Sequence, residues 1–400
     1  MPKTKSKAKK SDNLISKQVR LMPTPEQERN LYDWAHARRW AWNKYLGYRI
    51  RHYEQTGMKL TWQKMSRFIK FFRKHPKYDW VEKVPVVVLK QAFRDLDKAF
   101  ENFFDGISKF PKFKSRDKDT LRFSGRAEST YIEDGYVRLY EKSLKMGHTK
   151  TKTKAYGGKL HNVTVKFDGK YWYMSYAHAH ENQVRSTNGL SIGVDVGLKT
   201  LMVLSNGDKV KNINKSKKVK KLERRRKILE RRCSRKWDHH KVDTGRKNKK
   251  GQPIYRFNHT KNTDKLTKKI NRIYRKLRNI RQNHIHTATK AIIDMAPSKI
   301  VIEDIKVQNM TKNKKLAKHI SNAKWFEIRR QLTYKAKMYL GVDVTVADRW
   351  FASTQTCSCC GARKIKSDKL SLADRTYTCE CGNVIDRDLN AAINLANYTA

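Results

Sequence analysis

The sequence predicts a multidomain protein of α+β and α/β architecture, and three observations lead to this fold class. In the first half, aromatic side chains recur at helical spacing, and short alternating segments separated by Asp-Gly turns follow them. In the second half, runs of mostly apolar residues indicate strands that are buried on both faces of a sheet. Five of the six cysteines lie between Cys357 and Cys381. We therefore expect an N-terminal β-barrel interrupted by a helical bundle, then an α/β domain with a helical hairpin insertion and a cysteine-rich ribbon.

The charge of the chain identifies the class of its partner. The 91 Lys and Arg residues and 37 Asp and Glu residues give the 400-residue chain a formal net charge of +54, which a polyanion must neutralise in a compact protein. The mean hydropathy is −0.85, and no apolar run approaches the roughly 20 residues of a membrane-spanning helix, so we expect no membrane partner. Residues 1–13 are basic and polar and lack the apolar core of a secretory signal. We interpret them as a disordered arm and expect a cytoplasmic, nucleoid-associated protein that binds nucleic acid.

Residues 25–110 are predicted to form a helical domain. Thr24 is a helix-capping residue, with Pro25 at the first helical position and Gln27 three residues after the cap. Two stripes of mostly apolar residues then recur at helical spacing, and we interpret them as the core of a small bundle rather than as platforms for base stacking. They are Leu31, Trp34, Arg38, Trp42 and Tyr45, and then Leu89, Phe93, Leu96, Phe100 and Phe103. The interleaved Lys90, Gln91 and Arg94 are candidates for contact with nucleic acid.

Residues 14–24 and 111–186 are predicted to form one small β-barrel. The segments LRFSG, YIEDGYVRLY and KLHNVTVKFDGKYWYMSYAH alternate apolar and polar residues and are divided by Asp-Gly turns, which is typical of hairpins. Because residues 14–21 also read as a strand, the helical domain would interrupt this barrel. The basic loop FPKFKSR, with Lys112 and Lys114, is a further candidate for contact with nucleic acid.

Residues 187–350 are predicted to form the α/β domain, with a basic helical insertion at 211–296. Residues 190–204 read as a strand, a turn and a second strand, while residues 298–305 and 342–348 read as two more strands. The insertion carries 12 Lys or Arg residues between Lys215 and Arg235, followed by a Gly/Lys loop at 244–251 and a long second helix. Because plain solvation does not require so one-sided a charge, we expect this hairpin to contact phosphates. The candidates are Lys217, Lys218, Arg224, Arg225, Arg275 and Arg278.

Three acidic residues stand out against apolar surroundings. Asp195 lies inside IGVDVG and Glu303 follows KIVI, both in buried-strand patterns where an unpaired carboxylate is costly. Asp388 lies at the start of the last predicted helix. One such acid is usually a structural residue, but three in one α/β domain favour a site for hard cations such as Mg²⁺ or Mn²⁺. Two ions about 3.5–4 Å apart can activate a water and stabilise the leaving oxygen of a phosphodiester.

The clustered cysteines predict a structural zinc site. Cys357 and Cys360 are separated by two residues, and Cys379 and Cys381 by one, with 18 residues between the pairs. Four thiolates match tetrahedral zinc, and the gap between the pairs is in the range of zinc ribbons. Cys359 is a surplus thiol that could replace one of the four. Residues 351–385 are the expected ribbon, and residues 386–400 form the final segment of the α/β domain.

Four motifs in order carry a resemblance to a known family. They are GVDVGLKTLMVL, IVIEDIK, CSCCG…YTCECG and DRDLNAAINL. Their arrangement is that of the RNase H fold, and together they resemble the TnpB family, transposon-encoded RNA-guided nucleases related to the compact type V CRISPR effectors. The resemblance covers nearly the whole chain. It implies that residues 14–24 and 111–186 form a wedge domain, that residues 25–110 form a recognition domain, and that residues 187–350 form a RuvC-like nuclease domain.

By this resemblance Asp195, Glu303 and Asp388 match the three RuvC-type catalytic acids. Asp386 is the alternative to Asp388, and is expected otherwise to cap the helix or to contact the metal ligands from outside. Strand alternation puts Asp304 on the face opposite to Glu303. The resemblance implies two Mg²⁺ ions at the acids, Zn²⁺ at the cysteines, a guide RNA bound by one protein monomer, and cleavage of both strands of double-stranded target DNA beside a short motif. A repressor that binds without cutting, and a CRISPR-associated effector with an array-derived guide, are the alternatives.

Overall fold

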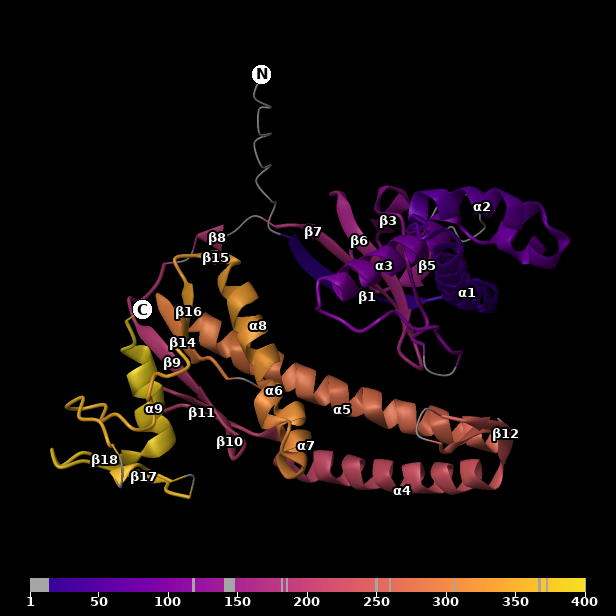
Figure 1. Ribbon diagram of the computed structural model, residues 1–400. Coiled ribbons are helices and arrows are strands. Elements are labelled where there is room, and N and C mark those ends of the chain that lie inside the picture. The colour runs from indigo at the N-terminus through magenta and orange to yellow at the C-terminus, as the bar shows by residue number, and fades with distance from the viewer. Residues whose placement is uncertain are drawn as a thin grey trace. The chain divides into compact units, whose positions relative to one another are not determined.

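The computed structural model of the chain describes most of its residues, and they divide into two compact units, Met1–His180 and Glu181–Ala400 (Figure 1). The described residues are 14–116, 119–139, 148–180, 183–184, 186–248, 251–258, 260–305, 307–365, 368–371 and 373–399. The predicted arm, residues 1–13, lies outside them. Among the described helices, none combines the length and the apolar character that a membrane span requires.

The helices of the first unit follow the sequence-based prediction. Helix α1 (Pro25–Thr56) begins with a complete capping box, in which Thr24 and Gln27 each accept a hydrogen bond from the backbone of the other, and it ends at Gly57. Helices α2 (Trp62–Lys74) and α3 (Val86–Phe104) and the 3-10 segment η1 (Pro76–Lys83) complete the bundle. Both predicted apolar stripes lie in its core or against it, except for Phe103 at the end of α3. The prediction that these aromatic side chains serve packing is therefore confirmed for all but that end.

A seven-stranded antiparallel sheet makes up the rest of the first unit. Its order is β2-β6-β7-β1-β5-β4-β3, so β1, which precedes the helices, pairs with β7, which follows them. Because β2 and β3 are the outer strands and the described residues contain no pairing between them, the sheet is a curled half-barrel, and the expected barrel is confirmed only in part. The strands are β1 (Leu14–Met22), β2 (Arg122–Ser124), β3 (Thr130–Glu133), β4 (Tyr136–Leu139), β5 (His148–Thr151), β6 (Leu160–Phe167) and β7 (Trp172–Ala179), with a 3-10 turn at Ala127–Ser129.

A five-stranded mixed sheet forms the centre of the second unit. Its order is β11-β10-β9-β14-β16, where β9, β10 and β11 are antiparallel neighbours and β14 lies parallel to both β9 and β16. The strands are β9 (Ser191–Val196), β10 (Thr200–Leu204), β11 (Lys209–Lys211), β14 (Lys299–Glu303) and β16 (Asp343–Ala347). A small parallel pair, β8 (Gln183–Val184) and β15 (Tyr339–Leu340), lies outside this sheet.

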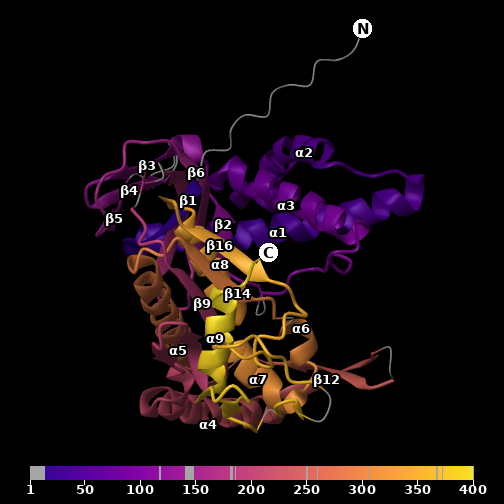
Figure 2. The same ribbon diagram turned by 90° about the vertical axis from the view of Figure 1, so that its left-hand side faces the viewer.

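Helices cover both faces of this sheet. The C-terminal half of α5 (Lys261–Asp294) and α8 (Trp325–Ala336) pack on one face, and α9 (Arg387–Ala396) packs on the other and lies along β9 in both views (Figures 1 and 2). Short helices α6 (Val307–Met310) and α7 (Lys314–Ala323) follow β14. Strands β17 (Thr376–Thr378) and β18 (Val384–Asp386) belong to the cysteine-rich segment and lead directly into α9.

The basic insertion is the expected helical hairpin with one difference. Helix α4 (Lys217–His239) follows the 3-10 turn η4 (Ile213–Lys215) and packs along α5, as Figure 1 shows. Between the two helices, where the sequence predicts a Gly/Lys loop, the chain forms the antiparallel strands β12 (Lys241–Lys247) and β13 (Pro253–Phe257). The loop prediction is correct for the turn that holds Asn248 and Gly251, and wrong for residues 244–247, which belong to β12. Apart from Val242, this exposed strand is polar, so it has no alternating apolar face that the sequence could reveal.

Gly193 on β9 allows α9 to lie against the sheet. A Cβ atom at this position would sit 1.9 Å from the backbone oxygen of Ala392 and 2.5 Å from the backbone nitrogen of Ala396. Neither backbone atom can move without shifting the whole helix. The close approach of β9 and α9 therefore requires glycine at this position.

Replacing Gly193 by alanine is expected to destabilise the second unit by about 3 kcal/mol, because overpacking forces the helix and strand apart. Thermal unfolding followed by circular dichroism measures the effect. Gly157→Ala is the matched control, since a Cβ atom there meets nothing within 4 Å. Equal melting temperatures for the two variants would contradict this account of the packing.

Candidate functional site

Two of the three predicted acids lie side by side on neighbouring strands. In the parallel pairing of β9 and β14, Val194 is opposite Ile302, so the next positions along the strands are Asp195 and Glu303. Ile192, Val194, Ile300 and Ile302 all enter the core that packs against α5 and α8. Since successive side chains alternate between faces, Asp195 and Glu303 both lie on the opposite face, where α9 packs.

Helix α9 brings Asp388 to the same place. The Ser191 hydroxyl donates a hydrogen bond of 2.7 Å to the backbone oxygen of Ala396, and Gly193 lies against Ala392. Two residues of a strand and four residues of a helix each advance by about 6 Å, so the helix and strand remain in step as they run antiparallel. The next pair in this series is Asp195 with Asp388. The charge of Asp388 indeed acts on the Asp195 carboxyl group.

The two aspartates of the DRD motif have different surroundings. Asp386 is the N-cap of α9: its carboxylate accepts hydrogen bonds from the backbone nitrogens of Asp388 and Leu389, at 2.9 and 3.2 Å, and an ion pair from Lys209 at 3.0 Å. Burial opposes ionisation of Asp386, but these donors outweigh it and lower its pKa. Asp388 is half-buried and contacts Arg387 at 3.1 Å. The capping role considered for Asp386 is therefore what the structure shows.

The carboxylates of the site disfavour one another's charge. Withdrawal of the Asp195 carboxylate from solvent, followed by repulsion from Asp388 and Glu303, raises the pKa of Asp195 to about 7, although the residue as a whole keeps some exposure. Burial also raises the pKa of Glu303, with a contribution from Asp304. Asp304 itself pairs with Arg329 at 2.9 Å and Arg349 at 2.8 Å, which balance its charge. Carboxylates whose negative charges repel one another form the kind of oxygen ligand set that binds a hard divalent cation.

Neutralising Asp195 is expected to stabilise the metal-free protein. The pKa of this carboxyl is near 7 in the folded chain and near 3.9 in an unfolded one, so the fold favours the protonated form and loses stability as the pH rises from about 4 to above 7. Asp195→Asn should therefore raise the free energy of unfolding at pH 8 by up to about 4 kcal/mol, and by much less at pH 5.

Thermal unfolding of the wild type and of Asp195→Asn in EDTA, at both pH values, measures this effect. Added Mg²⁺ should stabilise only the wild type, and so should reduce the difference in stability between the two proteins. A stability difference that is the same at pH 5 and pH 8 would contradict the pKa shift.

Four cysteines converge in the C-terminal segment. The sulfur atoms of Cys357, Cys360, Cys379 and Cys381 all lie within 4.8 Å of one another, with 3.7 Å between Cys357 and Cys381 and 3.6 Å between Cys360 and Cys379. Tetrahedral zinc with bonds of about 2.3 Å separates its sulfur ligands by about 3.8 Å, so this set fits the ion. Within the described part of the chain it is the one group of three or more potential metal ligands that comes together this closely. Cys359 is exposed and outside the cluster.

The predicted nucleic-acid contacts in the first unit differ in availability. Lys90, Arg94 and Lys112 are exposed, although the guanidinium of Arg94 lies 4.4 Å from the centre of the Trp62 ring. Gln91 donates a hydrogen bond to Asp95. Lys114 is half-buried with its ammonium 3.6 Å from the centre of the Trp42 ring, and burial followed by the charge of Arg38 lowers its pKa to about 8.

The predicted contacts on the helical hairpin are mostly open to solvent. Lys217, Lys218, Arg224, Arg225 and Arg278 are exposed, and Arg275 is half-buried. The structure thus leaves five of the six candidate cations on α4 and α5 open to solvent.

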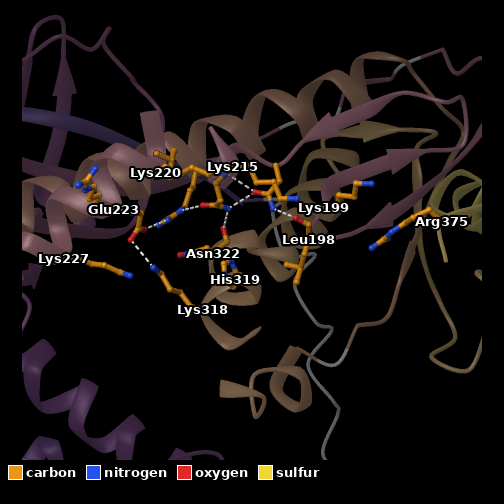
Figure 3. Close-up of a pocket in the computed structure, with 15 residues that line it drawn as sticks. Leu198, Lys199, Lys215, Lys220, Glu223, Lys227, Lys318, His319, Asn322 and Arg375 are labelled. Atoms are coloured by element: carbon orange, nitrogen blue, oxygen red, sulfur yellow. Dashed lines mark hydrogen bonds and ion pairs between the residues drawn. The ribbon is translucent and has the colours of Figure 1, made fainter. Parts of the chain in front are cut away.

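A basic cavity of about 800 Å³ was missed by sequence reasoning (Figure 3). It lies at the base of the hairpin and is lined partly by residues that the sequence did not single out, among them Lys199, Lys318 and Arg375. Their sequence positions lie far apart, so no local pattern connects them. A second cavity, of about 400 Å³, lies beside Glu303 and is also lined by Val196, Trp325, Phe326 and Arg329.

Three family models match parts of the chain. The model described as "Probable transposase" matches residues 173–314, and the model described as "Cas12f1-like, TNB domain" matches residues 325–395. A "Helix-turn-helix domain" model matches residues 13–58, a stretch that holds strand β1 and the single helix α1 in this structure.

Two relatives are similar over most of the chain. A protein of Streptomyces pristinaespiralis described as "Putative RNA-guided DNA endonuclease" is 30% identical over 377 residues, which cover 94% of this chain and 87% of the relative. InsQ of Escherichia coli K12, which carries the same description, is 27% identical over 94% of this chain and 90% of its own length. Among solved structures, a Cas12f1–sgRNA–target DNA complex aligns with a TM-score of 0.36 at 13% identity, covering 96% of this chain and 99% of that chain.

Proposed function

Because the chain belongs to the TnpB family of RNA-guided DNA endonucleases, we propose that it binds a transposon-derived guide RNA and cuts double-stranded DNA that pairs with the guide. The observation that carries the proposal is the meeting of Asp195, Glu303 and Asp388 on one face of the five-stranded sheet. The net charge of +54 supports it as well, since an RNA scaffold together with a heteroduplex presents many phosphates. Base pairing would read the target sequence, and the protein would read a short adjacent motif.

The second unit is proposed to be an RNase H-like, RuvC-type nuclease domain. Its sheet starts with three antiparallel strands and continues with two parallel ones in the order β11-β10-β9-β14-β16, which is the strand order of that fold. We assign residues 187–350 and 386–400 to this domain, with the insertion at 211–296 and the ribbon at 351–385. Residues 14–24 and 111–186 are assigned to the wedge domain and residues 25–110 to the recognition domain.

The three carboxylates are the proposed ligands of two Mg²⁺ ions, which when bound would activate a water and stabilise the leaving oxygen of the phosphodiester. The protein's part is to hold the ligands in place. Asp195 and Glu303 are fixed by the parallel pairing of β9 and β14, and Asp388 is fixed by α9, which Gly193 lets approach. Asp304 is proposed to take no part in metal binding, because its carboxylate is paired with Arg329 and Arg349.

The cysteine cluster is proposed to hold a structural Zn²⁺ ion. Four thiolates leave no open coordination position, so the ion would fold the ribbon rather than act in cleavage. The ribbon in turn is attached to α9, because Asn390 donates a hydrogen bond to the Thr356 oxygen at 2.7 Å and accepts one from the Ser358 nitrogen at 2.9 Å. Asn394 donates to the oxygens of Ser353 and Thr356. Zinc binding would thereby support the helix that carries Asp388.

The first unit is proposed to contact the guide RNA and the target-adjacent motif. Lys90, Gln91 and Arg94 on α3 are our candidates for the motif, with Lys112 and Lys114 on the neighbouring loop. One protein monomer is expected to bind one guide RNA.

Sequencing the RNA that co-purifies with the protein tests this function. We expect one abundant species whose end matches DNA next to the gene of origin, bound at about one RNA per chain. If a chain that folds and binds DNA co-purifies with no specific RNA, the RNA-guided function is wrong. An end of the RNA that matches a CRISPR array would instead identify the CRISPR-associated alternative.

A further inference from the structure

The basic cavity at the base of the hairpin has no role in the function proposed above. It is open to solvent on one side and is lined by residues of α4, α5, α7, η4, the turn that follows β9 and the residue before β17 (Figure 3). Fifteen residues line it, and Glu223 is the single acid among them. Eight are lysine or arginine: Lys199, Lys215, Lys220, Arg224, Lys227, Arg281, Lys318 and Arg375.

The acid in the cavity is already neutralised. Glu223 accepts hydrogen bonds from Arg281 at 2.7 Å and Arg226 at 2.8 Å, and it pairs with Lys318 at 3.4 Å. Burial opposes its ionisation, but these partners outweigh burial and lower the pKa of Glu223 to about 2. Arg281 is also held by Asn214, at 2.7 Å. The negative charge of Glu223 is therefore already paired with these three cations and is not available to the other cations of the cavity.

The remaining cations of the cavity have no counter-charge within the described part of the chain. Lys199, Lys215, Lys220, Arg224, Lys227 and Arg375 are exposed and form no ion pair with a described acid. In Figure 3, Lys227 and Lys318 lie toward one end of the cavity, and Lys199 and Arg375 lie toward the other. Cations distributed along a cavity match a ligand with several negative charges in a row rather than one small anion.

The cavity is close to the three acids. Leu198 and Lys199, which line it, follow Asp195 by three and four residues, so their Cα atoms are within about 15 Å of that of Asp195 even in an extended chain. The turn is held in place, because Asn212 donates a hydrogen bond of 2.8 Å to the Leu198 oxygen and Trp325 donates one of 3.4 Å to the Gly197 oxygen. A polyanion in the cavity would thus lie a few nucleotides at most from the proposed site of cleavage.

We propose that this cavity holds the sugar–phosphate backbone of the DNA strand being cut and positions the neighbouring phosphodiester at Asp195, Glu303 and Asp388. The inference rests on the proposed endonuclease function. The cavity lies beside the acids, and this position favours the DNA strand being cut as its ligand. The scaffold of the guide RNA is less suitable, because it does not have to enter the cleavage site. Lys220, Arg224 and Lys227, spaced as one face of α4, are positioning residues in this account.

A triple variant tests the inference, with Lys220, Arg224 and Lys227 each replaced by glutamine. The matched control replaces Lys269, Arg272 and Lys276 by glutamine, which removes the same three charges from exposed positions of α5 in the same hairpin, outside the cavity. Both variants should keep the melting temperature of the wild type. With saturating guide RNA and target DNA, we expect the cavity variant to cut bound DNA about 10- to 100-fold more slowly than the control, because a displaced phosphodiester reacts slowly. Guide RNA and target affinities should match those of the control.

Uncharged methylphosphonate linkages placed one to four nucleotides from the cut identify the ligand. When the linkage replaces the phosphate that the cavity binds, it should slow cleavage by the wild type about as much as the triple substitution does. In the triple variant, the same linkage should cause no further decrease in the cleavage rate. If the cavity variant loses guide RNA affinity but cuts at the normal rate once bound, the cavity binds the RNA instead. If the wild type cuts and the cavity variant cuts and binds like the control, the inference fails while the proposed function stands; if the wild type cuts no DNA at all, the proposed function fails.

Discussion

Replacing Glu303 by glutamine, or Asp388 by asparagine, is expected to reduce DNA cleavage at least about 100-fold, while guide RNA and target DNA remain bound. Each substitution keeps the size of the side chain but removes a charged metal ligand from the end of β14 or the start of α9. Since the three acids would serve both strands in turn, cleavage of both strands should be lost together. Single-turnover cleavage of end-labelled duplex DNA in Mg²⁺ measures the rate on each strand.

Two neighbouring acids provide the controls. Asp304→Asn removes a carboxylate one residue from Glu303 but only breaks partly exposed ion pairs with Arg329 and Arg349. Asp386→Ser removes a carboxylate two residues from Asp388, and serine keeps the N-cap hydrogen bond of α9. Both variants should cut within about 5-fold of the wild-type rate, since helix caps and surface ion pairs each contribute about 1 kcal/mol. If Asp386→Ser abolishes cleavage and Asp388→Asn does not, the two aspartates exchange roles.

Replacing Cys379 by serine is expected to remove the zinc and most of the cleavage activity with it. Serine is a poor zinc ligand, and the loss of a structural zinc costs the folding free energy that its binding supplies, about 10 kcal/mol or more for small zinc domains. The ribbon would unfold and release Thr356 and Ser358 from Asn390, leaving the start of α9 less firmly held. Metal analysis should give about one zinc per wild-type chain and well under one for the variant.

Cys359→Ser is the matched control for this prediction. Cys359 neighbours Cys360 in the chain but is exposed and lies outside the cluster, so the variant should keep the zinc, the stability and the cleavage rate. Loss of zinc in Cys359→Ser, with zinc retained in Cys379→Ser, would mean that the ligand set differs from the four clustered sulfurs. If the wild-type chain without zinc still cuts DNA, cleavage does not depend on the folded ribbon, and this prediction is wrong.

Strand alternation explains how much of the acid site the sequence could reveal. A period of two residues is sufficient to put Glu303 and Asp304 on opposite faces, and the structure has Asp304 turned toward two arginines. The pairing of β9 with β14, which brings Asp195 beside Glu303, depends on contacts between segments about one hundred residues apart and came only from the resemblance. The position of Asp388 needs the close contact of α9 with Gly193, which no local pattern specifies.

Features that depend on tertiary context were harder to predict. The apolar stripes of α1 and α3 are sufficient to predict both helices and the face that each one buries, because periodicity and burial are linked within one segment. Whether the sheet of the first unit closes depends on its two outer strands, β2 and β3, and alternation does not determine that. Lys114 reads as an exposed cation in a basic loop, but the loop packs on α1 and lays this side chain over Trp42.

Cleavage of two plasmids that differ only in the segment matching the guide RNA tests the central claim most directly. The purified protein with its RNA should linearise the matched plasmid in Mg²⁺, leave the mismatched plasmid intact, and cut neither in EDTA. Replacing the guide segment of the RNA should exchange the two results. Cleavage of both plasmids regardless of the guide, or cleavage that persists in EDTA, would contradict an RNA-guided nuclease whose cations are held by Asp195, Glu303 and Asp388.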